Sequence, residues 1–350
     1  MKQKKVLVAM SGGIDSSVCA LLVQEMGYEA SGITMQLWGE DETNSADAKK
    51  IAERLLMNHE TVVLKEDFRE CVVNRFISDY TEGLTPNPCV ECNRTLKFGK
   101  LFEIAQAEGY DFLATGHYAK VEQNDDGKWQ LKKAADEKKD QSYFLWSIKK
   151  EILPHLLLPL GAYTKSEIRM IAEEHQFENA HRSDSQDICF IPDGDYAAFI
   201  QAHTNQTFPK GNFVSPDGKI LGEHQGLIHY TVGQRKGLGI ALGQPAFVAT
   251  KNVTENTVTL TTDAELYATE LTARNVNFLC SESTDSRRIT AKIRYRHTPS
   301  PATLTKLGED RVKVVFDEPQ RAIAPGQSVV FYDGDVVLGG GIIEPQNQEN

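Results

Sequence analysis

Residues 11–17, with the sequence SGGIDSS, have the types and spacing of a site that holds an anion. Gly12 and Gly13 let the backbone approach a ligand closely, and the serines add hydroxyl donors. A helix beginning here would point its free N–H groups and the positive end of its dipole at one spot. Asp15 could hold a Mg²⁺ ion that bridges phosphates. We therefore predict a nucleotide-phosphate site, with an ordinary glycine turn as the alternative.

The same loop lacks the lysine of the G-x-x-x-x-G-K-[ST] motif. Without a lysine aimed at the terminal phosphate, transfer of the γ-phosphoryl group is the less favoured chemistry. The loop instead resembles that of the ATP-pyrophosphatase superfamily, whose members adenylate an oxygen and release pyrophosphate.

The neighbouring elements are predicted to place this loop at the edge of a sheet. Residues 5–10 form a short apolar run typical of a buried strand, and helical spacing follows from Ser16 to Met26. Further strands are expected over 29–35, 60–65 and 111–117, and further helices over 45–58, 66–80 and 96–109. Such β-α-β units predict an α/β domain whose parallel sheet carries helices on both faces. Ligands in these sheets bind beyond the carboxyl ends of the strands.

The residue composition and the hydrophobic pattern of the chain change after about Ala202. Before that point, residues 84–93 are predicted to be a proline-rich loop, 121–139 a hairpin or mobile excursion, and Thr164 the start of a capped helix. Afterwards, glycine-rich and alternating β segments dominate. We predict a catalytic domain over 1–202, a small central α+β domain over 203–272 and a C-terminal β-barrel over 273–350.

Composition narrows the classes of protein to consider. The chain has 350 residues, 40% of them hydrophobic, which allows more than one core. No stretch is long enough for a membrane span, and the N-terminal apolar run is too short for a signal peptide. Six cysteines in this length do not form a disulfide scaffold, so we expect a reduced, cytoplasmic setting. Cys19 and Cys71 fit core positions.

Basic residues gather in three places although the net charge is −11. The clusters are Lys132, Lys133, Lys138 and Lys139; Arg235 and Lys236; and Arg287, Arg288, Lys292, Arg294 and Arg296. The last set alternates along an expected strand, so several of its side chains would share one face, and Tyr295 adds a ring for stacking. Solvated charge is the ordinary explanation, but three separate clusters also suit contact with a folded RNA.

Several longer motifs extend this interpretation: PNPCVECNRTLKFG, GHYAK, KDQSYFLW, DSQDICFIP and GLIHYTVGQRKGLGI. Together with SGGIDSS they resemble the bacterial tRNA-specific 2-thiouridylase family, with matching motifs from Met10 to about Phe331. The resemblance implies an enzyme that replaces the C2 oxygen of the wobble uridine with sulfur, using ATP and a persulfide. AMP and pyrophosphate would be the other products.

The resemblance also implies roles for single residues. Cys92 would be the nucleophile and Cys189 the persulfide carrier. ATP would contact Ala9, Met10, Ser11, Gly12, Gly13, Ile14, Asp15, Ser16, Met35 and Gly116. Asn87, Pro88 and Cys89 would face the target uracil, which must leave its stack first. Further tRNA contacts would be His117, Lys139, Asp140, Gln141, Arg294, Tyr295 and Gln327.

These roles also make chemical sense from the residues alone. An amide-type oxygen is a poor leaving group and needs activation, which adenylation provides. Sulfur needs a nucleophilic carrier, and a second thiol resolves the intermediate. Cys189 could instead be a core cysteine beside Phe190, and Cys92 half of a zinc site, although a second C-x-x-C or a close pair of histidines is absent from the sequence.

Cys89 is a departure, because many members of the family carry Asp at this position. Cys89, Cys92 and Cys189 could therefore ligate an iron–sulfur cluster with one iron open to hydrosulfide. We keep this cluster-dependent thiolase as the alternative to the persulfide mechanism.

Two other classes of protein remain open at this point. An amidating ligase of the same superfamily would use ammonia, but it would leave Cys92 and Cys189 idle. An RNA-binding module could retain the nucleotide loop as a switch. For the favoured enzyme we expect ATP and Mg²⁺, tRNA as partner, and sulfur from a persulfide-donating relay protein or a cysteine desulfurase. We expect a monomer with no membrane contact.

Overall fold

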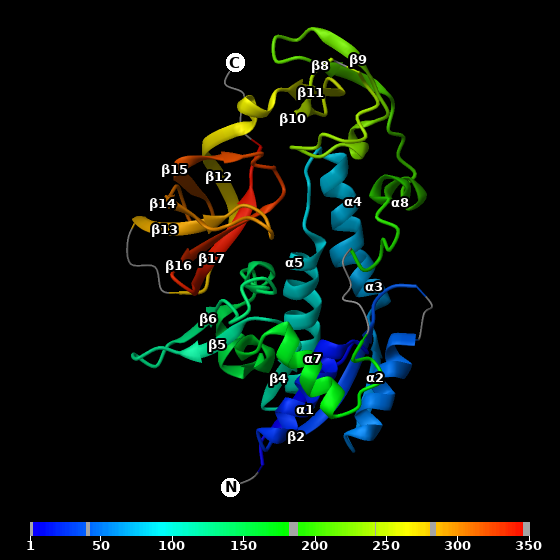
Figure 1. The fold of residues 1–350 in the computed structure, drawn as a ribbon, viewed down its shortest axis with the longest axis vertical. Helices are drawn as coiled ribbons and strands as arrows, with labels where there is room; N and C mark the ends of the chain where they lie inside the picture. The colour runs from blue at the N-terminus through cyan, green and yellow to red at the C-terminus, as the bar shows by residue number, and fades with distance from the viewer. Residues whose placement is uncertain (1–2, 40–42, 182–187, 242, 281–284, 346–350) are drawn as a thin grey trace.

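The protein consists of a parallel α/β layer, a small sheet at the opposite end and a barrel at the side (Figure 1). The computed structural model describes residues 3–39, 43–181, 188–241, 243–280 and 285–345. Part of one motif, residues 184–187, lies outside them. No helix in the described part of the chain combines the length and apolar character that crossing a membrane requires.

The N-terminal sheet is parallel throughout, which confirms the predicted α/β class. Its order is β3 (His59–Val63), β2 (Glu29–Gln36), β1 (Lys5–Ala9), β4 (Phe112–Thr115) and β7 (Leu156–Leu157). The carboxyl ends of β1 and β4 are therefore neighbours. Gly12 and Gly116 follow those two ends.

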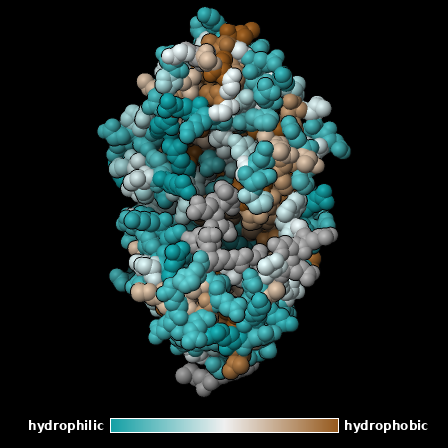
Figure 2. Space-filling model, turned by 45° about the vertical axis from the view of Figure 1, so that its right-hand side comes forward, coloured by the Kyte–Doolittle hydropathy of each residue, from teal (hydrophilic) through white to brown (hydrophobic). Residues whose placement is uncertain are grey.

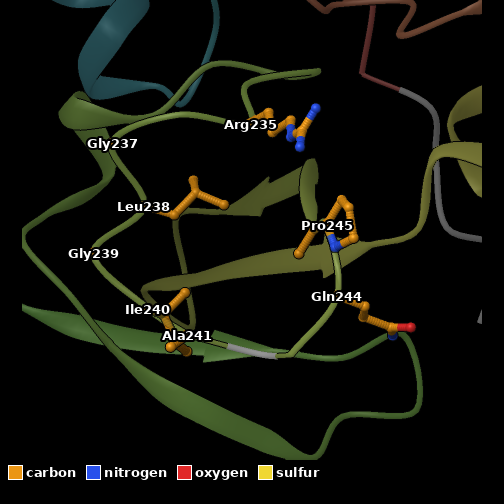
Figure 3. Close-up of a pocket in the computed structure, with 9 residues that line it drawn as sticks. Arg235, Gly237, Leu238, Gly239, Ile240, Ala241, Gln244 and Pro245 are labelled. Carbon is orange, nitrogen blue, oxygen red and sulfur yellow. The ribbon is translucent and has the colours of Figure 1, made fainter.

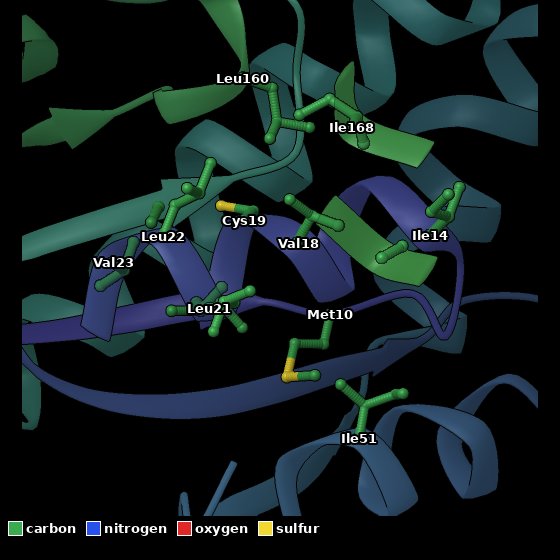
Figure 4. Packing of buried hydrophobic residues seen from close by; sticks show 14 of the residues in the cluster. Met10, Ile14, Val18, Cys19, Leu21, Leu22, Val23, Ile51, Leu160 and Ile168 are labelled. Carbon is green, nitrogen blue, oxygen red and sulfur yellow. The ribbon is translucent and has the colours of Figure 1, made fainter. Parts of the chain in front are cut away.

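Both faces of this sheet are covered by helices because its central strand is apolar on both sides. Val6 and Val8 pack in one core with α1 (Ile14–Glu25), α2 (Thr43–Arg54) and α7 (Lys165–Glu174), as Figure 4 shows in part. Leu7 packs on the other side with Phe98 and Leu101. The capping box predicted at Thr164 is present and begins α7.

The expectation of a loop over residues 84–93 was wrong for its second half. A helix begins at Pro88 and continues through α5 (Pro88–Cys92), the π-helical η2 (Asn93–Lys100) and α6 (Leu101–Ala107). Asn87 caps it by accepting a hydrogen bond from the Cys89 N–H, and a proline at the first helical position costs no backbone bond. Cys89 and Cys92 therefore lie on a helix, one turn apart.

The helix expected over 66–80 is present with a π-helical interruption. It comprises α3 (Lys65–Phe68), η1 (Arg69–Val73) and α4 (Asn74–Thr81). The helix α8 (Tyr196–Ala202) packs its aromatic residues against this element through Phe76 and Tyr80. Short 3-10 turns link other elements: η3 (Ser142–Phe144), η4 (Lys150–His155), η5 (Pro159–Ala162), η6 (Leu227–His229) and η7 (Asp263–Leu266).

The central part of the chain forms a four-stranded sheet over a core of its own. The strand order is β10 (Phe247–Asn252), β11 (Thr257–Thr261), β8 (Gly211–Val214) and β9 (Ile220–His224). Phe213, Tyr230, Val248 and Val258 are buried in that core. We refer to this unit as the middle domain.

The C-terminal strands close into a six-stranded antiparallel barrel. Around the barrel they are β12 (Tyr267–Phe278), β15 (Val312–Arg321), β14 (Ser300–Lys306), β13 (Ser286–Lys292), β16 (Ser328–Asp333) and β17 (Val336–Ile343), and β17 pairs back with β12. The hairpin predicted within 121–139 is present as β5 (Lys120–Gln123) and β6 (Trp129–Lys132). Its pairing with β17, where Val336 faces Lys132, was not foreseen.

Candidate functional site

The loop over residues 11–17 is held by hydrogen bonds among its own residues. Gly13 is the N-cap of α1 and has no side chain to cap the helix, so no side chain caps the N–H groups of the first turn. The Ser16 and Ser17 hydroxyls each donate to the Gly13 carbonyl at 3.0 Å, and the Ser11 N–H donates to the Ser16 hydroxyl at 3.1 Å. An anion at this helix end would meet preorganised donors.

Two residues distant in sequence fix the loop. A Cβ atom at Gly116 would lie 2.9 Å from the Asp15 carbonyl carbon and the Ser16 nitrogen, so only glycine fits where β4 ends. The Asn179 amide donates to the Gly12 carbonyl and the Ser17 hydroxyl, both at 2.9 Å. Gly116 was predicted from the sequence, whereas nothing local around Asn179 indicated its contact with the loop.

Asp15 is paired with a lysine in this structure. The Lys165 ammonium donates to both Asp15 oxygens, at 2.7 and 2.8 Å, and the Tyr118 hydroxyl donates to one of them at 2.7 Å. Lys165 is the first residue of α7 and is only 8% exposed. The loop that lacks a lysine in its own sequence therefore has one from a helix 150 positions later.

This pairing limits how Asp15 can serve Mg²⁺. Among the residues described, no three His, Cys, Asp or Glu side chains are grouped so that they could hold a metal ion. Mg²⁺ on a nucleotide needs only one or two protein carboxylates, the phosphates and water supplying the rest. Asp15 fits as such a single ligand only if Lys165 releases it.

The other residues expected at the nucleotide divide into two kinds. Met10 and Ile14 are buried in the core beside α1, so only their backbone atoms face the loop (Figure 4). Met35 is half-buried near the carboxyl end of β2, and Ala9 ends β1. Of the two side chains at strand ends, Met35 is the larger, and an adenine could lie against it.

The three thiols predicted to act together are neighbours. Cys89 and Cys189 are exposed and Cys92 is buried, and all three are free. Cys92 lies one turn from Cys89 on the same helix and packs in one hydrophobic cluster with Ile188 and Phe190, the residues on either side of Cys189. The positive charge of Lys97 on η2 lowers the pKa of all three thiols. Lys97 belongs to the motif PNPCVECNRTLKFG, but no role for it was predicted.

The surroundings keep these thiols protonated in the present conformation. Burial raises the pKa of Cys92 to about 12, while Lys97 lowers it. Desolvation by neighbouring atoms also raises the pKa of Cys89 and Cys189, again opposed by Lys97. Because the thiolate is the nucleophile, ionisation requires greater exposure or a closer cation. Lys97 is the cation that already lowers the pKa of all three thiols.

His117 links the phosphate loop to the thiols. It follows Gly116, its Nδ1 lies 2.7 Å from the Thr115 hydroxyl, and its ring lies 5.5 Å from that of Phe98. Burial, and then the charge of Lys97, holds the pKa of His117 well below its usual range, so the ring is neutral. His117 is only 9% exposed, and its expected contact with tRNA remains a prediction.

Three other expected tRNA contacts have partners inside the protein. The Asp140 carboxylate accepts from the Ala134 and Ser142 N–H groups at 3.1 Å, and the Gln141 side chain accepts from the Tyr118 N–H at 2.9 Å. The Gln327 amide donates to the Thr85 carbonyl at 2.8 Å. Lys139 is half-buried on the same turn as Asp140.

The basic residues of the barrel are arranged differently from the prediction. β13 ends at Lys292, so Arg294 and Arg296 lie in the following turn and do not alternate along a strand. Arg287 and Arg288 pair with Asp333 and Asp317. Arg296 is exposed, and Arg294 donates to the Arg321 carbonyl at 3.0 Å. The ring centre of Tyr295 lies 4.5 Å from that of Phe144, and the Tyr295 side chain is partly accessible.

A pocket of about 450 Å³ lies apart from this site, in the middle domain. It is lined by the glycine-rich segment that follows Arg235, with Leu238 and Pro245 facing its interior (Figure 3). The surface view is mainly hydrophilic and is hollowed near its centre (Figure 2). Arg235 and Lys236 are exposed beside the pocket.

Comparison with known proteins gives full-length matches. The model of the tRNA methyl transferase HUP domain matches residues 4–193, that of the tRNA methyl transferase PRC-barrel domain 197–262, and that of the aminomethyltransferase beta-barrel domain 268–343. A tRNA-specific 2-thiouridylase MnmA of Clostridioides difficile is 45% identical, covering 97% of this chain and 98% of the relative. One of Acetivibrio thermocellus is also 45% identical, covering 98% and 100%.

Among solved structures, a 4-thiouridine synthetase–RNA complex with bound ATP is similar over 57% of this chain and 50% of that one. The identity is 16% and the TM-score 0.37, values too low to support an inference.

Proposed function

The chain belongs to the tRNA-specific 2-thiouridylase family, and from this membership we propose that it is an ATP-dependent sulfurtransferase that converts uridine to 2-thiouridine in tRNA. The observation that carries the proposal is that the phosphate loop and the three thiols are joined by packed residues. Gly116 packs on the phosphate loop, and the ring of His117 next to it lies 5.5 Å from that of Phe98, on the helical segment that carries Cys89 and Cys92. One site can thus activate the oxygen and receive the sulfur.

We assign the two half-reactions as follows. The C2 oxygen attacks the α-phosphate of ATP, so that pyrophosphate leaves and the base becomes an adenylate. The outer sulfur of a persulfide on Cys189 then attacks C2 and expels AMP. Finally the Cys92 thiolate attacks the Cys189 sulfur, which frees the thiolated base and leaves a Cys92–Cys189 disulfide for an external thiol to reduce.

The finer parts of the assignment are also proposals. Mg²⁺ would arrive with the nucleotide and take Asp15 as its protein ligand. Sulfur would come from a persulfide-donating relay protein or a cysteine desulfurase. The residue roles and the domain boundaries at 202 and 272 remain predictions, and β12 runs across residue 272.

The cheapest test is whether nucleotide cleavage depends on tRNA. We expect AMP, pyrophosphate and 2-thiouridine to form in equal amounts only when unmodified tRNA and a persulfide donor are both present. An amidating ligase would instead consume ammonia. A binding module would form no AMP, and ADP as the product would contradict the cleavage site. Nucleotide analysis by chromatography distinguishes these outcomes.

We also predict that tRNA binding is electrostatic, with a contribution from the turn after β13. Each phosphate contact releases counterions, so affinity should fall steeply with salt. Replacing exposed Arg296 with alanine should lower the slope of log affinity against log salt by roughly one. Arg288→Ala is the matched control, because Arg288 is already paired with Asp317. Equal slopes for wild type and Arg296→Ala would exclude this turn from the interface.

A further inference from the structure

Residues 83–87, which connect α4 to α5, touch both other domains just before the helix that carries Cys89 and Cys92. We call this segment the strap. Figure 1 shows it as the extended trace between these two helices, passing close to the middle domain and the barrel. The Thr85 side chain is buried, and Asn87 at its end caps α5.

The barrel holds the strap through one turn that follows Ala324. The Thr85 N–H donates to the Pro325 carbonyl at 2.8 Å. The Gln327 amide donates to the carbonyls of Thr85 at 2.8 Å and Pro86 at 3.3 Å. Gly326 has a φ of +90°, and a Cβ atom there would lie 2.8 Å from the Thr85 nitrogen.

The turn itself is anchored within the barrel. The Gly326 N–H donates to the Ile343 carbonyl and the Ile343 N–H returns to the Gln327 carbonyl, both at 2.9 Å. Because Ile343 ends β17, the turn is continuous with the barrel sheet. A displacement of the barrel therefore reaches the strap directly.

The middle domain holds the start of the strap. Lys251 on β10 donates to the Tyr230 carbonyl at 2.9 Å and to the Leu84 carbonyl at 3.4 Å, and its ammonium lies 5.6 Å from the centre of the Tyr80 ring. A Cβ atom at Gly83 would lie 2.9 Å from Val253. All backbone polar groups of Leu84 to Pro86 thus have partners, and two of the three domains supply most of them.

We propose that the strap sets the position of Cys89 and Cys92, and that Gln327, Gly326 and Lys251 are positioning residues for sulfur transfer. This inference rests on the proposed function. It also gives Gln327 a different task from direct tRNA contact: its amide holds the backbone that leads into the nucleophile's helix. Binding of RNA to the barrel and the geometry of the thiols are thereby coupled through one turn.

The structure offers matched variants for the test. Gln327→Met removes the amide that holds the strap, whereas Gln320→Met removes a barrel amide that donates to the Glu318 carbonyl. Gly326→Ala forces a Cβ atom against Thr85. Gly334→Ala also places alanine at positive φ, +58°, but with no atom within 4 Å.

Three quantities should be measured on the full-length proteins: amide hydrogen exchange over residues 83–92 without tRNA, kcat for 2-thiouridine at saturating tRNA, and the Kd for tRNA. We expect Gln327→Met and Gly326→Ala to speed exchange and to lower kcat roughly tenfold or more, with Kd changed less than about twofold. Both controls should behave like wild type in exchange and kcat.

Two outcomes would overturn the proposal. A raised Kd with intact kcat for Gln327→Met would make Gln327 a direct tRNA contact. Equal behaviour of Gly326→Ala and Gly334→Ala would mean that the strap is not held at this turn. If the wild type formed no 2-thiouridine, the proposed function would fall, but the exchange comparison would still decide whether the barrel holds the strap.

Discussion

Replacing Cys92 or Cys189 with alanine is expected to lower 2-thiouridine formation by roughly three orders of magnitude or more, because each thiol acts in a bond-forming step. Both variants should still release pyrophosphate when tRNA is present, since adenylation needs neither sulfur. Cys189→Ala should leave the AMP group on the base, because no persulfide expels it, whereas Cys92→Ala should release AMP for a single turnover only. Mass spectrometry of digested tRNA and chromatography of nucleotides give the two readings on the same sample.

Cys89 separates the two sulfur-transfer mechanisms. Under the persulfide mechanism Cys89→Asp should keep much of the activity in air, because it restores the residue that many members of the family carry. Under the cluster mechanism the same change removes one of three thiolate ligands, so activity and bound iron should both be lost. Cys89→Asp, Cys92→Ala and Cys189→Ala should each be assayed twice, once as purified in air and once after reconstitution of an iron–sulfur cluster.

The structure gives each mechanism some support. Cys89 and Cys92 lie one turn apart, and Cys92 packs in one cluster with the residues on either side of Cys189, a closeness that an iron–sulfur cluster would need. However, no group of three metal-binding side chains is assembled within the described residues, and Lys97 beside the thiols suits stabilisation of a thiolate. We favour the persulfide route. An inactive Cys89→Asp protein, together with wild-type activity only when iron is present, would make us abandon it.

The parallel sheet and its loop were predictable because their signals are local. An apolar strand, two glycines and helical spacing occur within about twenty residues, and the Thr164 capping box within four. The start of α5 was missed even though Asn87 and Pro88 are an ordinary N-cap and first residue. The nearby Pro86 had made the whole segment look like a loop.

The contacts that complete the site were not predictable, because they join distant parts of the chain. Lys165 and Asn179 reach the phosphate loop from more than 140 positions away, and Gln327 reaches the strap from more than 200. A single sequence carries periodicity and capping, which report on neighbours. It has no comparable signal that Lys165, the lysine of α7, will face Asp15.

Substitutions at Asp15 and Lys165 are expected to have the second large effect. Asp15→Ala should abolish formation of both AMP and pyrophosphate. Lys165→Met should lower it roughly a hundredfold or more, because the cation nearest the loop would be missing when negative charge develops on the departing pyrophosphate. Lys165→Arg keeps the charge and should recover part of the rate.

A purely structural role for Lys165 would give a different pattern. If the lysine served only to neutralise Asp15, its loss would leave an unpaired carboxylate, lowering thermal stability and all ligand affinities together. If it binds the leaving group, inhibition by pyrophosphate should weaken about tenfold or more in Lys165→Met while inhibition by AMP is unchanged, since AMP has no β-phosphate. Comparing the two inhibition constants, with the melting temperature as control, decides between the roles. Equal weakening for both inhibitors would confine Lys165 to the support of Asp15.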